Sequence, residues 1–104
     1  MKQDVFDYLC NDLGLDEGDA VPLYEAFVES FNQTVGDLRA TDPSDFDGIR
    51  RVTHAIIGFS QNLGAKDLFE AAKTLNASAH ACNAALCEKG IAAIFALHDA
   101  YMAP

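Results

Sequence analysis

The chain has 104 residues, half of them apolar, and a formal net charge of −9, which is typical of one soluble domain with an acidic surface. This charge argues against binding to nucleic acid or to an anionic membrane, because both surfaces attract clustered Lys and Arg. The chain has no run of 18 apolar residues, so no transmembrane helix is expected. The polar segment MKQDVFDYLC lacks the apolar region of a secretory signal. Three cysteines, an odd number, predict reduced thiols in a cytoplasmic protein.

Apolar residues recur at spacings of three and four along the chain, which predicts helices. The first predicted helix is short and covers about residues 3–13, because Gly14 provides a stop. Its apolar residues, which share one side, are Val5, Phe6 and Leu9. We expect this helix to cap one end of the fold.

The second predicted helix begins near Asp19, a candidate N-cap, with Pro22 close to the position where a helix accepts proline. Its apolar stripe covers roughly five turns. The stripe consists of Tyr24, Phe27, Val28, Phe31, Val35 and Leu38. The segment ATDPSDFDG that follows contains Pro43 and several capping residues, so it is predicted to be a connection.

The third predicted helix runs from about Asp45 to Leu63 and stops at Gly64. The fourth begins near Ala65, and we place the turn before the fifth at Asn83, since the segment has no strong breaker before Gly90.

Four amphipathic helices joined by short connections predict an all-α fold, namely an antiparallel up-down four-helix bundle with a short N-terminal cap helix. The bundle is expected over about residues 19–103, and residues 1–104 are predicted to form one domain.

One histidine of the third predicted helix is expected to face solvent. Successive helical residues are rotated by about 100°, so the expected core sector contains Val52, Ala55, Ile56, Phe59 and Leu63. His54 lies about 160° from the centre of that sector. Its outer face is shared by Arg50, Ile57, Gly58 and Gln61, with Arg51 at the edge.

The glycine one turn after this histidine needs an explanation. Glycine in a helix interior costs about 1 kcal/mol relative to alanine. The simplest explanation for Gly58 is that something large must approach His54, and Ile57 adds apolar surface for a partner. A helix defect at Gly58, a substitution without a role at Ile57 and a solvated face at Arg50 and Arg51 stay open as alternatives.

An exposed imidazole has chemistry that a partner could use. Imidazole in water has a pKa of about 6.5, so at neutral pH a large fraction is neutral and nucleophilic. A nitrogen of His54 could attack phosphorus held in another protein's active site. Arg50, Arg51 and Gln61 could donate hydrogen bonds to the phosphoryl oxygens.

The segments FDGIRRVT and HAIIGFSQNLG, residues 46–53 and 54–64, resemble the histidine phosphotransfer (HPt) domain of two-component phosphorelays. The residues that fit the family pattern are His54, Gly58, Ser60, Leu63 and Gly64, and GAKDLFEAAKTL matches the entry into the next helix. The family usually has Lys three residues after the histidine, where this chain has Ile57. Arg50, Lys66 or Gln61 could replace that lysine, the phosphohistidine could be shorter-lived, or a partner could supply the charge.

The resemblance implies that His54 accepts a phosphoryl group from a receiver-domain aspartate and passes it to another receiver. It implies response-regulator receiver domains and a hybrid histidine kinase as partners, which dock on the outer faces of the second and third helices. No Gly-rich phosphate loop occurs, so no ATP site is expected, and Mg²⁺ is expected in the receiver rather than in this chain. The chain is expected to be a monomer.

Two other functions stay open. The first is a degenerate HPt adaptor that binds receivers or kinases without efficient transfer, which Ile57 favours. The second is a structural helical interaction module, which gives His54 no role and leaves Gly58 unexplained.

The other histidines and cysteines are expected to be structural. His80, Cys82 and Cys87 contain zinc-binding atom types, but residues two apart on a helix point in different directions. Cys82 and Cys87 are therefore predicted to be small packing residues. His98 lies on the apolar stripe of the last helix and is predicted to be partly buried. No cofactor or metal is expected in this chain.

Overall fold

The computed structural model describes residues 3–103, with only the backbone of residues 3 and 4. Residues 1, 2 and 104 of the predicted domain lie outside this range. The elements are α1 (Gln3–Asp7), the π-helix η1 (Tyr8–Asp12), α2 (Glu17–Arg39), α3 (Phe46–Asn62), α4 (Lys66–His80) and α5 (Ala84–Met102). The predicted all-α class is confirmed, since no strand occurs among the described residues.

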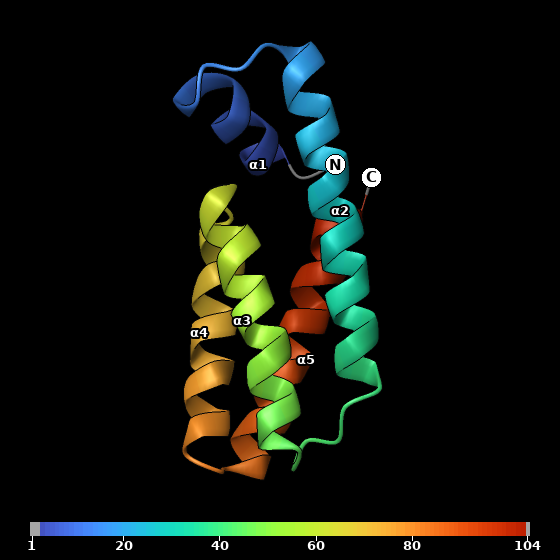
Figure 1. Ribbon diagram of the computed structural model, residues 1–104, viewed down its shortest axis with the longest axis vertical. Helices are drawn as coiled ribbons and strands as arrows, with labels where there is room; N and C mark the ends of the chain where they lie inside the picture. Colours follow the sequence, from blue (N-terminus) through green and yellow to red (C-terminus); the bar gives the residue numbers. More distant parts are fainter. Residues whose placement is uncertain (1–2, 104) are drawn as a thin grey trace.

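The helices α2 to α5 run alternately in opposite directions along the long axis of the molecule (Figure 1). The molecule measures 43 × 22 × 17 Å. The predicted cap helix is divided into α1 and η1, which lie across the end where α3 stops and α4 begins (Figure 1). Among residues 3–103, no helix combines the length and the apolar character that crossing a membrane requires.

The start of α2 differs from the prediction. Asp16, rather than Asp19, is the N-cap, because Asp16 has extended backbone and its side chain accepts a hydrogen bond from the Asp19 amide. The helix therefore begins at Glu17, which places Pro22 inside α2 and not beside its start.

The predicted starts of the third and fifth helices are confirmed by their caps. The Asp45 side chain accepts from the Gly48 amide at the start of α3, and the Asn83 side chain accepts from the Leu86 amide at the start of α5. Cys82 precedes Asn83 with a φ of 55°, which reverses the chain between α4 and α5.

The two cysteines near this turn differ in environment. Cys87 is fully buried, as predicted, and burial together with the nearby Cys82 raises the pKa of its thiol. Cys82 is exposed, so the prediction that it is a packing residue is wrong. The reason is that the turn containing Cys82 lies beyond the end of the core. All three cysteines carry free thiols.

Aromatic side chains form the centre of the core. The Phe27 ring of α2 lies 5.7 Å from Phe31, 5.6 Å from Phe59 of α3 and 5.7 Å from Tyr101 of α5, measured between ring centroids. Edge-to-face and tilted pairs at these distances are favourable beyond the apolar area that they bury. This cluster holds α2 and α5 against α3.

The buried face of α3 is rotated by roughly 70° from the predicted sector, counting 100° per residue. Its buried residues include Ile49, Thr53, Ile56 and Ser60. Of the predicted core residues, Ala55 is exposed and Val52, Phe59 and Leu63 are only half-buried. The reason is that α3 packs most extensively against α4, so its buried stripe turns toward that helix.

We expect Gly64→Ala to destabilise the fold by about 1–2 kcal/mol, because Gly64 has a φ of 68° and a side chain is disfavoured there. An added Cβ would also lie 2.6 Å from Cγ of the Tyr8 ring, in the cap. Urea unfolding measures the loss, with Gly36→Ala as the matched control. Gly36 is helical, and beyond its own helix backbone and adjacent residues an added Cβ would meet no described atom within 4 Å, so its variant should gain about 1 kcal/mol. Equal stability of the two variants would contradict this expectation.

Candidate functional site

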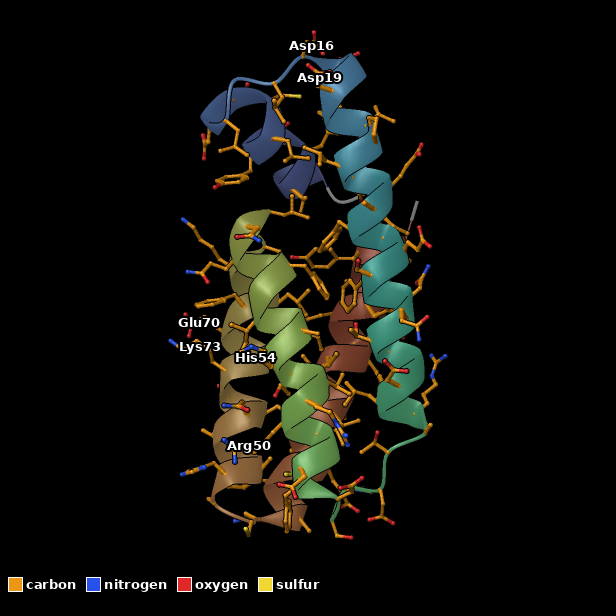
Figure 2. All side chains as sticks on the ribbon, in the orientation of Figure 1. Asp16, Asp19, Arg50, His54, Glu70 and Lys73 are labelled. Atoms are coloured by element: carbon orange, nitrogen blue, oxygen red, sulfur yellow. The ribbon has the colours of Figure 1, made fainter. Side chains whose placement is uncertain are left out.

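His54 lies in the middle of α3 and its side chain is exposed, as the sequence predicts (Figure 2). It lines a shallow depression of about 420 Å³. The other lining residues are Asp47, Arg50, Arg51 and Asn76. A helix is a rigid support for an exposed nucleophile, because its backbone hydrogen bonds hold the position of the side chain.

A buried hydrogen bond joins α3 to α4 next to this histidine. The Thr53 hydroxyl is fully buried and donates to Asn76 Oδ1 of α4 over 3.0 Å, and it also lies 3.0 Å from the Arg50 carbonyl. Because Asn76 Oδ1 accepts this bond, its Nδ2 is the atom that can donate toward the depression. Neither Thr53 nor Asn76 stands out in the sequence as a site residue.

Gly58 presents bare backbone one turn beyond the histidine. Gly58 is exposed. Beyond its own helix backbone and the adjacent residues, an added Cβ would meet no described atom within 4 Å. Close packing inside the domain therefore does not explain this glycine. Gln61, one turn further, is exposed as predicted.

The prediction that Ile57 faces solvent is wrong. It is half-buried and packs against the core, because the rotation of α3 toward α4 brings this side chain into the seam between the two helices. Ser60 is buried and donates to the Ile56 carbonyl over 2.6 Å. The Ser60 hydroxyl therefore has its hydrogen-bond partner within its own helix.

Lys66, a candidate to replace the missing lysine, does not lie beside His54. It is the first residue of α4 and lines a depression at the cap end together with Tyr8, Gly64 and residues of η1. Asn76, which lines the depression together with His54, is ten residues after Lys66 on α4. This separation corresponds to about 15 Å of helix.

Another lysine of α4 occurs at the height of the histidine. Figure 2 shows Lys73 and Glu70 of α4 at the level of His54, whereas Arg50 lies one turn earlier on α3. A signal for Lys73 existed in the sequence. In an antiparallel helix pair, residues equally distant from the connecting turn lie opposite each other, and His54 and Lys73 are ten residues before and nine residues after Gly64.

Three cationic side chains lie around His54, together with the carboxylates of Asp47 and Glu70, so this region is less acidic than the protein as a whole. Arg50 and Arg51 of α3 and Lys73 of α4 are three of the seven Lys and Arg residues of the chain, and all three are exposed. Such a cluster favours the approach of a phosphoryl group and of an acidic partner site.

The other two histidines have different surroundings. The His98 ring is half-buried as predicted, with Nε2 2.6 Å from Asn32 Oδ1 and its ring edge-to-face with Phe31 at 4.9 Å. His80 is exposed at the C-terminal end of α4. Within the described part of the chain, no three His, Cys, Asp or Glu side chains are grouped so that they could hold a metal ion.

Comparison with known proteins identifies the domain family. The family model for the Hpt domain matches residues 22–103, which include α3, α4, α5 and most of α2. No curated protein and no solved structure matches the chain. Since the family model covers well over half of the sequence, the chain belongs to the Hpt domain family.

Proposed function

We propose that His54 accepts a phosphoryl group from the aspartyl phosphate of a receiver domain and passes it to the aspartate of another receiver. Membership of the Hpt family supports a carrier role in phosphorelays. The observation that carries the assignment to His54 is its exposure on a rigid helix beside the bare backbone of Gly58.

The proposed chemistry is a reversible displacement at phosphorus. A lone pair of a neutral imidazole nitrogen forms the P–N bond while the P–O bond of the aspartyl phosphate breaks, and its electrons remain on the departing carboxylate. Transfer onward reverses these steps with the aspartate of a second receiver. The main requirement is that the nitrogen and the leaving oxygen are in line with phosphorus.

The receiver would supply most of the catalytic machinery. Receiver domains and kinases are the partners of the Hpt family. In this proposal the receiver holds the Mg²⁺ that neutralises charge, and this chain contributes the nucleophile, the Arg50 and Arg51 side chains and the Asn76 amide. The outer faces of α2 and α3 form the docking surface, and the carrier acts as a cytoplasmic monomer.

A second candidate is an adaptor that binds receivers or kinases without efficient transfer. The observation that favours it is the half-buried, uncharged Ile57, since α3 has no cation at the position three residues after the histidine. The exposed His54 favours the carrier over this adaptor.

Direct mapping of the phosphoryl group tests the proposed function. The purified chain is mixed with receiver domains already phosphorylated on aspartate, and the phosphorylated product is fragmented under neutral conditions that preserve phosphohistidine. We expect one phosphoryl group, on His54. A phosphoryl group on His80 or His98 instead would overturn the assignment, and receiver binding without any phosphorylation would support the adaptor.

A further inference from the structure

We propose that Lys73 of α4 provides the cation that stabilises the phosphoryl group on His54. This inference rests on the proposed function, since it concerns the same phosphorylated histidine. A phosphoryl group on imidazole brings about two negative charges to an exposed surface, and a nearby ammonium favours that state.

The register of α3 and α4 places Lys73 at the required height. The hydrogen bond between the Thr53 hydroxyl and Asn76 Oδ1 sets residue 76 opposite residue 53. Because the helices are antiparallel, moving three residues back along α4 reaches Lys73, opposite residue 56 of α3. Figure 2 shows the same relation, with Lys73 and His54 at one height on the two neighbouring helices.

This position is level with the turn of α3 that carries Ile57. The Ile57 side chain is half-buried in the core and has no charge. The four-carbon stem of Lys73 lets an ammonium anchored on α4 reach toward the face of α3, since each of its bonds can rotate.

The ammonium of Lys73 has a weak partner in the unphosphorylated state. It lies 5.1 Å from the centroid of the Phe69 ring, one turn earlier on α4, and the side chain is exposed. An exposed cation–π contact is weaker than a charge-assisted hydrogen bond to a phosphoryl oxygen. Phosphorylation of His54 would therefore draw the ammonium away from Phe69.

Other cations of the site are placed less well for this role. Arg50 lies one turn before His54 on α3, away from the level of Ile57 and toward the end of the molecule where α5 begins (Figure 2). Arg51 lines both the depression of His54 and the groove between α2 and α3, and it precedes His54 on α3, away from the level of Ile57. Lys66 lies at the cap end.

The test measures the lifetime of phospho-His54 in the wild type and in Lys73→Gln. Potassium phosphoramidate, a chemical phosphoryl donor, loads each protein without a receiver, and the decay of phosphohistidine is followed after removal of the donor. We expect Lys73→Gln to shorten the half-life roughly two- to fivefold, which is the effect of one exposed charge pair. Lys66→Gln, the matched control on the same helix, should leave the half-life unchanged.

A rescue variant separates a local charge from a structural effect. Adding Ile57→Lys to Lys73→Gln should restore the half-life, because it returns an ammonium to the same level from α3. Equal half-lives for Lys73→Gln, Lys66→Gln and the wild type would overturn the role of Lys73. Circular dichroism spectra are expected to be identical for these surface variants of Lys66 and Lys73.

The two loading methods distinguish failure of this inference from failure of the proposed function. If receivers transfer to His54 but Lys73→Gln behaves like the wild type, Lys73 has no role and the carrier function stands. If chemical loading shows the Lys73 effect but no receiver transfers, the stabilising lysine stands and the carrier function does not.

Discussion

We expect His54→Gln to abolish phosphoryl acceptance while the fold and receiver binding are retained. Glutamine is similar in size and polarity, but its amide nitrogen has no lone pair available to attack phosphorus. His54 is exposed, so the free energy of unfolding should stay within about 0.5 kcal/mol of the wild type. Transfer of radiolabel from a phosphorylated receiver, followed on neutral gels, measures the loss.

His80→Gln is the matched control, because His80 is also exposed and helical but lies at the far end of α4. It should accept label at the wild-type rate. The same pair of variants separates the three functions. A carrier loses its label only in His54→Gln, an adaptor binds receivers but takes no label in any form, and a structural module neither binds nor takes label.

The second large effect is expected for Gly58→Phe. A rigid ring at this position would cover the open backbone beside His54 and displace the docked receiver. Displacement of reacting groups by about 1 Å can slow a reaction on the order of 100-fold, so we expect a loss of that size in the transfer rate. The variant should be no less stable than the wild type, and by helix propensity about 0.5 kcal/mol more stable.

Ala93→Phe is the control for this substitution. Ala93 is an exposed residue inside α5, a helix that is not part of the proposed docking surface. Transfer rates from a receiver under single-turnover conditions compare the two. Wild-type transfer by Gly58→Phe would show that nothing large approaches this glycine, and equal losses in both variants would point to a general effect of an exposed ring.

Much of this fold is determined by local sequence. Helix spacing and capping depend on residues within one or two turns, so Asp45, Gly64 and Asn83 were sufficient to place three boundaries. The prediction of Asp19 as the N-cap was wrong because Asp16 is also a capping residue type, and only the backbone conformation at Asp16 decides between them. The exposure of His54 was also predictable, since it lies far from either the predicted or the observed buried sector of α3.

The tertiary structure decided which helix each face of α3 meets. The periodicity of one helix shows that it has an apolar side, but the direction of burial depends on its neighbours. Packing against α4 buries Thr53 and half-buries Ile57, and it exposes Ala55. Gly90 shows the same dependence. It is a potential breaker in the sequence, yet it lies inside α5, where an added Cβ would be 2.8 Å from Leu75 Cδ1 of α4.

The sequence by itself therefore determined the helical class, most helix ends and the exposed histidine, because these depend on contacts within a few residues. Only the tertiary structure separated Lys66 from Lys73. Both are exposed lysines of one helix, seven residues apart, and about 10 Å of helix lies between them. The register between α3 and α4 decides which of them is level with His54, and that register is held by a contact between residues 23 positions apart, Thr53 and Asn76.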